Sequence, residues 1–387
     1  MKIAVVTGSR AEYGLLCPLM RLFKDDDFFR LQTVVTGMHL SPEFGLTYRE
    51  IETDGFEINY KVEMLLSGDT NVAVTKSTGL GMIGFADAFA LVKPDLIVLL
   101  GDRFETFAAA TAGYLAKIPI AHLHGGETTT GATDEALRHA ITKMAFLHFT
   151  SAEAYRRRVI QLGESPERVF NVGAIGLDNI KSLALLNREE LSKALEHDFT
   201  KPTVLITYHP VTLEQNTAEY QINELLAAFD EFPDLQIIFT LPNADANGRI
   251  IIEKIKSYVA ENERRAKYFV NLGQLRYLSS LQFVSAVVGN SSSGILEVPS
   301  FKIPTVNIGD RQTGRLKAES VIDAANDKSA IVEAIKRGLS EDFKTVCETA
   351  ANLYGDGNTA PRILQILKRL NNINSLKKSF YDLNEIR

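Results

Sequence analysis

Eight short polar clusters stand where apolar segments of the chain end, and their side chains suit acid–base chemistry and anion binding. The clusters begin at Thr7, Thr36, Gly101, His122, His209, Pro242, Gly289 and Gly309. The carboxyl ends of parallel strands share one edge of an α/β sheet, so these clusters should converge on a common crevice. The sequence therefore predicts a crevice that holds an anionic, sugar-bearing ligand.

The acidic candidates come from the first half of the chain. Asp102 and Arg103 follow the most hydrophobic predicted strand, and Glu127 follows the next one. Asp134 opens a predicted helix, on which it shares a face with Arg138. Crowded carboxylates push pKa values apart, so that one acts as a base while another acts as an acid near neutral pH. The catalytic candidates are Asp102, Glu127, Asp134 and the nearby His124, with a buried salt bridge or an acidic helix turn as the structural alternatives.

The anion-binding candidates come mainly from the second half. The run Gly289-Asn-Ser-Ser-Ser-Gly294 lies between a predicted strand and a predicted helix, where N–H groups and hydroxyls could surround a diphosphate. A serine N-cap with turn glycines is the structural alternative. Glu297, one turn later, is placed to reach a ribose diol. The candidate substrate and nucleotide contacts are Arg10, Arg103, His209, Ser291, Ser292, Glu297 and Arg311.

Two sets of short apolar segments, separated by helical patterns, predict two doubly wound units with parallel sheets. The first set of predicted strands covers residues 3–6, 31–35, 96–100, 118–122, 147–150 and 169–172, and the second covers 203–207, 236–240, 268–271, 286–288 and 305–308. Helices are predicted over 219–232 and 249–263, and a glycine-containing crossover over 173–178. We expect domains at 1–175 and 176–365, followed by a C-terminal helix and tail at 366–387.

Length, charge and cysteine content exclude several functional classes. The 387 residues exceed the size of a single core, and 45% hydrophobic with 23% charged residues is typical of a globular protein. A net charge of −6 argues against nucleic acid or an anionic membrane surface as a partner. Cys17 and Cys347 lie far apart, which predicts reduced thiols and a cytoplasmic protein. We expect no signal peptide and no membrane span.

The polar motifs, taken in order, resemble those of the hydrolysing UDP-N-acetylglucosamine 2-epimerases over about residues 1–370. They include Gly101-Asp-Arg-Phe-Glu105, His124-Gly-Gly-Glu127 and segments 7–14, 36–39, 138–143, 209–212, 289–294, 309–312, 354–358 and 361–364. The resemblance implies a GT-B-like fold of two Rossmann-like domains facing an interdomain cleft. It also implies chemistry without metal or cofactor, a homo-oligomer (dimer or tetramer), and a role in bacterial surface polysaccharide such as capsule.

The resemblance further implies a reaction and residue roles. UDP-N-acetylglucosamine would lose UDP to give 2-acetamidoglucal, and water would then add to give N-acetylmannosamine for sialic acid synthesis. Asp102 and Asp134 match acid–base positions, whereas His124 stands where many relatives have a glutamate. Whether His124 or Glu127 takes that role stays open. The implied nucleotide contacts are Ser291, Ser292, His209 and Arg311 for the diphosphate, Glu297 for the ribose, and Arg10 and Asn243 for other parts.

Other functions remain as alternatives. A hydrolysing UDP-N,N'-diacetylbacillosamine 2-epimerase, producing 2,4-diacetamido-2,4,6-trideoxymannose for legionaminic acid, would use the same machinery. A GT-B glycosyltransferase would pass the sugar to an acceptor, but its retaining members often carry two glutamates eight positions apart. The positions eight residues from Glu297 are Gly289 and Thr305, so Glu297 has no such partner and the glycosyltransferase reading is disfavoured. A nucleotide-sugar sensor without catalysis would leave the acidic cluster without a purpose. The sequence leaves the exact sugar, the oligomer size and feedback regulation open.

Overall fold

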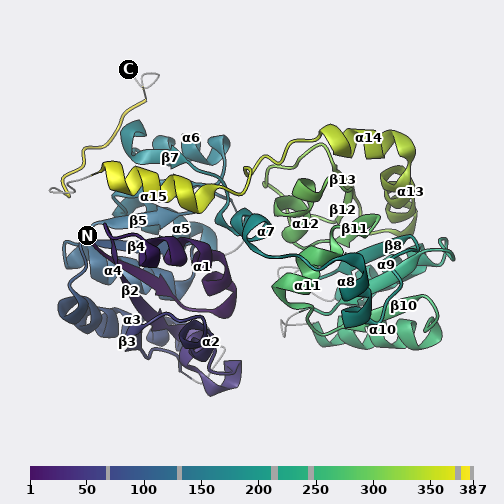
Figure 1. Ribbon diagram of the computed structural model, residues 1–387, viewed down its shortest axis with the longest axis horizontal. Helices are drawn as coiled ribbons and strands as arrows, with labels where there is room; N and C mark the ends of the chain where they lie inside the picture. Colours follow the sequence, from purple (N-terminus) through teal and green to yellow (C-terminus); the bar gives the residue numbers. More distant parts are fainter. Residues whose placement is uncertain (67–69, 129–132, 211–216, 243–247, 371–375, 384–387) are drawn as a thin grey trace. The chain divides into compact units, whose positions relative to one another are not determined.

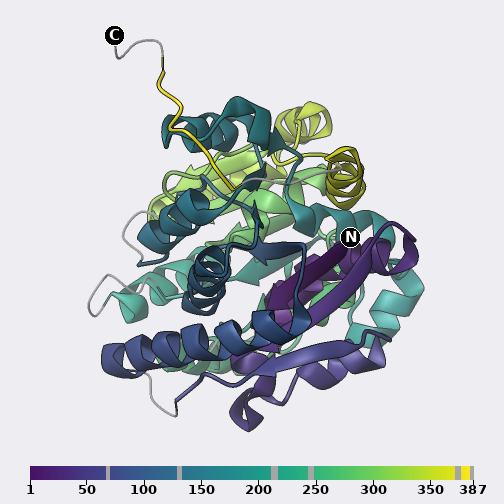
Figure 2. The ribbon, with the colours of Figure 1, turned by 90° about the vertical axis from the view of Figure 1, so that its left-hand side faces the viewer.

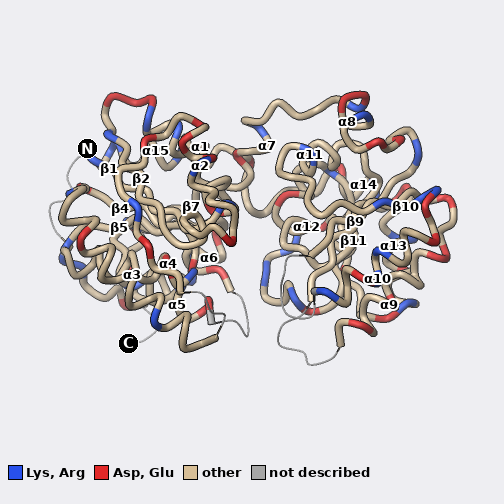
Figure 3. The backbone as a smooth tube through the Cα atoms, turned by 90° about the horizontal axis from the view of Figure 1, so that it is seen from below, with Lys and Arg blue, Asp and Glu red and all other residues tan. Residues whose placement is uncertain are grey.

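The computed structural model describes residues 1–66, 70–128, 133–210, 217–242, 248–370 and 376–383. The chain forms two compact units (Figure 1). The first unit consists of Met1–Ser182 together with Tyr354–Arg387, and the second consists of Leu183–Leu353. Acidic and basic residues are interspersed over both units, so neither sign of charge dominates one of them (Figure 3).

The first unit contains a seven-stranded parallel sheet of order β3-β2-β1-β4-β5-β6-β7. Its strands are β1 Lys2–Thr7, β2 Arg30–Thr36, β3 Ile58–Val62, β4 Leu96–Leu100, β5 Ile120–Leu123, β6 Leu147–Thr150 and β7 Val169–Asn171. Its helices are α1 Arg10–Asp25, α2 Tyr48–Thr53, α3 Asn71–Val92, α4 Phe104–Leu115, α5 Thr133–Met144, α6 Glu153–Gln161, α7 Asp178–Ser182 and α15 Thr359–Arg369, with 3₁₀ turns η1 Gly37–Leu40, η2 Pro42–Phe44, η3 Pro166–Arg168 and η4 Ile175–Leu177.

Alternate residues of the central strands enter different hydrophobic cores. Ile3 and Val5 of β1 lie in a core with residues of α1 and α15, whereas Ala4 and Val6 lie in a core with residues of α3 and α4. Successive strand side chains point to opposite faces of a sheet, so a strand covered by helices on both faces must be apolar throughout. The long helix α3 lies on the outside of this unit (Figure 2).

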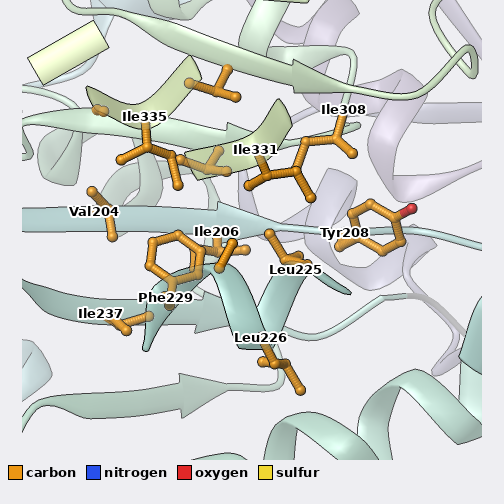
Figure 4. Packing of buried hydrophobic residues seen from close by; sticks show 14 of the residues in the cluster. Val204, Ile206, Tyr208, Leu225, Leu226, Phe229, Ile237, Ile308, Ile331 and Ile335 are labelled. Atoms are coloured by element: carbon orange, nitrogen blue, oxygen red, sulfur yellow. The ribbon is translucent and has the colours of Figure 1, made fainter. Parts of the chain in front are cut away.

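The second unit contains a six-stranded parallel sheet of order β10-β9-β8-β11-β12-β13. Its strands are β8 Thr203–Thr207, β9 Gln236–Thr240, β10 Ala266–Phe269, β11 Ala286–Gly289, β12 Thr305–Ile308 and β13 Val321–Ala324. Its helices are α8 Arg188–Leu195, α9 Ala218–Phe229, α10 Gly248–Glu261, α11 Gly273–Ser280, α12 Ser293–Leu296, α13 Lys328–Leu339 and α14 Glu341–Thr349, with the 3₁₀ turn η5 Val298–Phe301. Val204 and Ile206 of β8 pack with Phe229 of α9 and Ile331 of α13 in its core (Figure 4).

The expected pair of parallel α/β units is confirmed, but two strands were not predicted. Strand β3 alternates apolar and polar residues at the edge of its sheet and is mostly half-buried. Strand β13 is also an edge strand and contains the exposed Asp323. Both lack the continuous apolar pattern on which the prediction relied, because an edge strand is covered less completely than a central one.

The division of the chain differs from the expected domains at 1–175 and 176–365. The crossover falls between Ser182 and Leu183, and the chain returns to the first unit at Tyr354. Ala174 N–H donates to the Tyr354 carbonyl at 2.7 Å, and the hydroxyls of Tyr155 and Tyr354 lie 3.1 Å apart. Residues 354–365 therefore belong with the first unit, although they follow the second in sequence.

A glycine allows the returning segment to approach the first unit closely. Gly355 has a φ of +113°, and a Cβ placed on it would lie 3.1 Å from the Cα of Gly173. Any other residue would be strained at this φ and would crowd the facing backbone. The motif around Gly355 is thus a structural element of the boundary between the units.

The C-terminal segment also differs from the expected helix and tail at 366–387. Helix α15 ends at Arg369, and residues 376–383 have no helical structure. This segment is held to the first unit by Lys378, which donates to the Ala145 carbonyl at 2.7 Å and to Glu164 at 2.8 Å. Among the described residues, no helix is both long and apolar enough to span a membrane.

Asp178 is the residue that fixes the start of α15. Its carboxylate accepts hydrogen bonds from the backbone N–H groups of Thr359 at 2.9 Å and Ala360 at 2.6 Å. These are first-turn N–H groups that have no partner inside the helix. Their burial makes the carboxylate necessary for the return of the chain to the first unit.

Asp178→Ala should lower the free energy of unfolding of the first unit by about 1–3 kcal/mol, because it leaves two buried N–H groups without acceptors. Urea unfolding followed by circular dichroism measures this change. Asp356→Ala is the control, because it removes an exposed ion pair with Arg362 at 2.8 Å and should cost less than about 1 kcal/mol. Equal effects of the two substitutions would contradict the capping role.

Candidate functional site

Arg138 joins two predicted members of the acid–base group in the first unit. Its buried guanidinium, on α5, contacts the carboxylate of Asp102, which follows β4. It also donates to the backbone carbonyl of Glu127, which follows β5, at 2.6 Å, and lies 3.4 Å from Glu135. The structure therefore brings Asp102 and Glu127 together through one side chain, which the sequence analysis predicts only to share a helix face with Asp134.

The Glu127 carboxylate is buried and has two donors on one oxygen. The Ser151 hydroxyl, after β6, donates to Oε1 at 2.6 Å, and Nδ1 of His124 lies 3.0 Å from the same atom. The Glu127 carboxylate is thus held in place by residues from two neighbouring strand ends. Sequence reasoning missed Ser151, although it also follows a predicted strand.

Both ring nitrogens of His124 are engaged. Its Nε2 lies 3.2 Å from the backbone N–H of Ile175 and must accept that hydrogen bond. In a neutral imidazole the other nitrogen then carries the hydrogen, so Nδ1–H donates to Glu127. His124 also has a φ of +65°, a left-handed backbone conformation that is uncommon outside glycine. The geometry is that of a residue that orients Glu127.

Asp134 stands at the start of α5 and differs from Asp102 in its electrostatic surroundings. Partial removal from water and the negative charge of Asp102 raise the pKa of Asp134, and the charges of Arg103 and Arg138 oppose this shift. Asp102, by contrast, is in direct contact with a guanidinium. Two neighbouring carboxylates in such different surroundings are suited to different proton-transfer roles.

Two other predicted residues of the first unit have partners outside this group. Arg103 binds Glu105 through two contacts of 3.2 and 3.0 Å. Arg10 binds Glu50 at 2.9 Å, and both side chains are largely exposed. Neither arginine contacts the acid–base group directly in the bonds described here, although the charge of Arg103 lowers the pKa of Asp134.

Glu12 was not predicted as a site residue. It lies in the first turn of α1, and its carboxyl accepts a hydrogen bond from the backbone N–H of Gly8 at 2.6 Å. Burial is the main cause that raises its pKa to about 8, with a further contribution from Glu105. The sequence carries little signal for this, because an acidic residue in the first turn is normally a solvated partner of the helix dipole.

In the second unit, Asn290 organises the ends of two strands. Its side chain accepts from the His209 N–H at 2.7 Å and donates to the His209 carbonyl at 2.8 Å. Its backbone carbonyl accepts from Arg311 at 3.0 Å and from Gln312 at 2.9 Å. The predicted residues His209 and Arg311, which follow β8 and β12, are therefore brought together by a buried amide that sequence reasoning passed over.

The serine-rich turn after β11 contains only a short helix. Gly289 has a φ of +138°, and a Cβ there would lie 2.0 Å from the Thr207 carbonyl oxygen, so only glycine fits. The helix α12 has four residues, Ser293–Leu296, so Glu297 follows the helix directly. Ser292 precedes it and makes no side-chain capping bond, whereas the Ser291 hydroxyl accepts a hydrogen bond from the Ser293 N–H at 3.4 Å.

Glu297 lies beyond α12 and belongs to a small, half-buried network. The Ser293 hydroxyl donates to its carboxylate, and the Tyr277 hydroxyl lies 2.6 Å from that of Ser293. Burial raises the pKa of both Glu297 and Tyr277.

Asn243, another predicted contact, lies outside the described residues. Among the described residues, no group of three or more His, Cys, Asp and Glu side chains is arranged to hold a metal ion.

The family model for UDP-N-acetylglucosamine 2-epimerase matches residues 21–368 of this chain. The chain belongs to this family. The recognition of the family from the polar motifs is confirmed, and so is the expectation of an enzyme of the hydrolysing UDP-sugar 2-epimerase kind.

Curated relatives of this family member align over nearly its whole length. The GDP/UDP-N,N'-diacetylbacillosamine 2-epimerase (hydrolyzing) of Campylobacter jejuni is 44% identical and aligns over 99% of both chains. The polysialic acid biosynthesis protein P7 of Escherichia coli is 39% identical, over 99% of this chain and 98% of its own. The UDP-N,N'-diacetylbacillosamine 2-epimerase (hydrolyzing) of Legionella pneumophila is 37% identical, over 95% of this chain and 96% of its own.

A solved structure supports the fold of this epimerase family member. The UDP-GlcNAc 2-epimerase of Neisseria meningitidis, bound to UDP-GlcNAc, matches with a TM-score of 0.83 and 18% identity, over 95% of this chain and 100% of its own. The expected GT-B-like fold of two doubly wound domains is confirmed.

The buried Glu12 predicts a pH dependence of stability. Its pKa is about 8 in the folded chain against a usual value of 4.5, so the folded state keeps a proton that the unfolded chain loses between these values. Its stabilising contribution is therefore complete below about pH 4.5 and is lost as the pH rises toward about 8.

Relative to Glu12→Gln, the wild-type free energy of unfolding should fall by at least about 1 kcal/mol between about pH 5 and pH 8.5, as measured by urea denaturation. Glu50→Gln, which changes an exposed carboxylate, serves as the control and should keep the wild-type profile. Parallel profiles for wild type and Glu12→Gln would contradict the buried protonated state.

Proposed function

We propose that this enzyme is a hydrolysing UDP-N,N'-diacetylbacillosamine 2-epimerase, whose substrate sugar carries acetamido groups at C2 and C4 and a methyl group at C6. The 44% identity to the Campylobacter jejuni enzyme over 99% of both chains carries this proposal. The Legionella pneumophila relative, with the same sugar in its name, adds support at 37% identity. The product would be 2,4-diacetamido-2,4,6-trideoxymannose, for legionaminic acid and a bacterial surface polysaccharide.

Epimerisation of UDP-N-acetylglucosamine to N-acetylmannosamine, for sialic acid synthesis, is the second candidate. The description of the family model and the E. coli relative from polysialic acid biosynthesis favour it. Because the E. coli relative is 39% identical, against 44% for the Campylobacter enzyme, we rank this function second.

The reaction requires a base, an acid and stabilisation of a leaving diphosphate. No carbonyl activates the C2–H bond, so a base must remove the proton while the C1–O bond to UDP breaks. The C–H electron pair forms a C1–C2 double bond, and UDP leaves with the electrons of the C1–O bond. Water then adds to C1 while an acid delivers a proton to C2 from the opposite face, which inverts C2.

The first unit would supply the proton transfers. Asp134, with its raised pKa, is suited to hold and deliver a proton, whereas Asp102 is held as a partner of Arg138. Glu127 is the third acidic group, and His124 orients it. Of the two residues that the sequence leaves open for this role, we therefore propose Glu127 as the acid–base residue.

The second unit would hold the nucleotide. His209 and Arg311, both fixed by Asn290, would contact the diphosphate with Ser291 and Ser292. Glu297 would accept from the ribose hydroxyls. Arg10 and Asn243 stay proposed contacts to other parts of the nucleotide, and Arg103 stays a proposed contact to the substrate.

We also propose that the enzyme is a homo-oligomer, which the exposed apolar face on α3 supports. We propose a cytoplasmic location as well, which the free thiols of Cys17 and Cys347 support.

Proton NMR in deuterated water tests the substrate. With UDP-N,N'-diacetylbacillosamine, purified enzyme should release UDP rapidly and form a free manno-configured sugar with deuterium at C2, because the transferred proton exchanges with solvent. UDP-N-acetylglucosamine should react at least about tenfold more slowly, since a pocket shaped for the 4-acetamido and 6-methyl groups loses those contacts. The GDP-linked sugar is included because the Campylobacter relative is named for both nucleotides.

Faster turnover of UDP-N-acetylglucosamine would overturn the sugar assignment in favour of the second candidate. A product still attached to UDP would contradict the hydrolytic reaction itself.

His124→Asn and His124→Leu separate an orienting role from proton transfer. Asparagine keeps an N–H donor toward Glu127 and tolerates positive φ, so kcat should stay within about threefold of wild type. Leucine removes the donor, and kcat should fall at least about tenfold with little change in KM, because Glu127 is no longer held in place. UDP release gives both constants, and circular dichroism checks folding.

Asp134→Asn is the comparison, because it removes a titrating group and should lower kcat at least about a hundredfold. If His124→Asn lost as much activity as Asp134→Asn, His124 would itself transfer protons.

A further inference from the structure

His122 is a fully buried histidine near the end of β5 that connects two segments of the candidate site. Its Nε2 lies 2.7 Å from the carbonyl oxygen of Gly101. Its Nδ1 lies 3.1 Å from the hydroxyl oxygen of Thr142, which is also fully buried, on α5. One imidazole ring therefore joins the strand end before Asp102 to the helix that carries Arg138.

The two partners decide where the hydrogen of the His122 ring lies. A carbonyl oxygen can only accept, so Nε2 must carry the hydrogen and donate it to Gly101. Burial is the main cause that lowers the pKa of His122 to about 3, and the positive charge of Arg138 acts in the same direction. The ring is therefore neutral at neutral pH, and its Nδ1 accepts from the Thr142 hydroxyl.

The bonded carbonyl belongs to the peptide group that joins Gly101 to Asp102. The N–H of Gly101 donates to the Leu123 carbonyl at 3.1 Å, so both backbone polar groups of this residue are bonded to β5. A rotation of this peptide group would carry the Asp102 carboxylate away from Arg138. The hydrogen bond from His122 opposes that rotation.

Helix α5 reaches the turn after β4 at two points. Arg138 contacts the Asp102 carboxylate directly. Thr142 lies four residues later, on the same helix face, and reaches the turn through His122. The loop after β5 packs on this second point, because a Cβ on Gly125 would lie 3.0 Å from the Thr142 hydroxyl oxygen and 3.1 Å from Nδ1 of the ring.

We propose that His122 and Thr142 are positioning residues of this enzyme, which hold the peptide group before Asp102 in one orientation relative to α5. This role rests on the proposed function, because it takes Asp102 as a member of the reacting group. The pair is buried and acts through Asp102 rather than on the sugar. Small displacements of a reacting group can cost up to about a hundredfold in rate.

Two pairs of variants separate a lost hydrogen bond from a lost shape. His122→Gln keeps an N–H donor at the ε position, and Thr142→Ser keeps the hydroxyl, so both should retain kcat within about threefold of wild type. His122→Leu should lower kcat at least about tenfold, and Thr142→Val at least about fivefold, because each breaks the connection between the turn and α5.

The split between rate and binding distinguishes positioning from general damage. KM and the dissociation constant of UDP should stay within about twofold of wild type in all four variants, because the second unit would hold the nucleotide. UDP release from whichever of the two candidate UDP-sugars wild type turns over faster gives kcat and KM, and calorimetry gives the affinity for UDP. Circular dichroism checks folding, and Thr142→Val, which replaces only a hydroxyl by a methyl group, reads the same connection if His122→Leu does not fold.

His197→Leu is the matched control. His197 is another buried histidine, and its Nε2 lies 3.0 Å from the hydroxyl of Thr203, at the start of β8. The starts of parallel strands lie at the opposite edge of the sheet from their carboxyl ends. This variant should therefore lower the urea midpoint of the second unit but keep kcat within about twofold of wild type.

The double variant Asp102→Asn/Thr142→Val tests whether the pair acts through Asp102. In the Asp102→Asn background, Thr142→Val should lower kcat by less than about a further twofold, because the carboxylate that the pair positions is already absent. Full multiplication of the two losses would overturn the positioning role. Wild-type kcat in both His122→Leu and Thr142→Val, with activity lost in Asp102→Asn, would overturn that role alone. Wild-type kcat in Asp102→Asn would instead overturn the part of Asp102 in the proposed function, and the positioning role with it.

Discussion

One buried guanidinium sets the geometry of the acidic groups in the first unit. Arg138 contacts the carboxylate after β4, the backbone carbonyl after β5, and its own helix α5. A buried cation is costly without partners, so the two strand ends and the helix are held in one arrangement. Burial and the negative charge of Asp102 raise the pKa of the nearby Asp134, while Arg103 and Arg138 oppose this shift. The two aspartates differ in their surroundings, because Arg138 contacts the carboxylate of Asp102 directly.

The second unit reaches a similar result with a neutral side chain. Asn290 uses both its amide and its backbone carbonyl to hold the residues that follow β8 and β12. A neutral amide adds no charge of its own beside a diphosphate, and it costs little to bury when both of its polar atoms are bonded. In both units, the residue that organises the site is therefore different from the residues that would contact the ligand.

The return of the chain to the first unit constrains the rest of the fold. Helix α15 completes the core beside α1, with Ile363 and Leu367 fully buried. Two segments therefore connect the units, and cutting the sequence at either one would leave the first unit incomplete. Helix α3 lies in the same unit but contributes only one of its faces to the core. Its outer face carries exposed apolar residues, among them Ile83 and Leu91.

The sequence by itself determined the α/β class, most strands, the polar clusters and the family, because apolar runs that end in polar motifs are local patterns. Only the tertiary structure decided which side chains meet. Arg138 meets Asp102 across 36 residues, Tyr155 meets Tyr354 across 199, and Ile175 fixes the ring of His124 across 51. Such contacts depend on how distant segments pack. The burial of the Glu12 carboxyl could not be predicted either, because the sequence does not distinguish it from a solvated carboxyl. The edge strands β3 and β13 and the boundary between the units escaped prediction for the same reason, since their stability comes from neighbours far away in the chain.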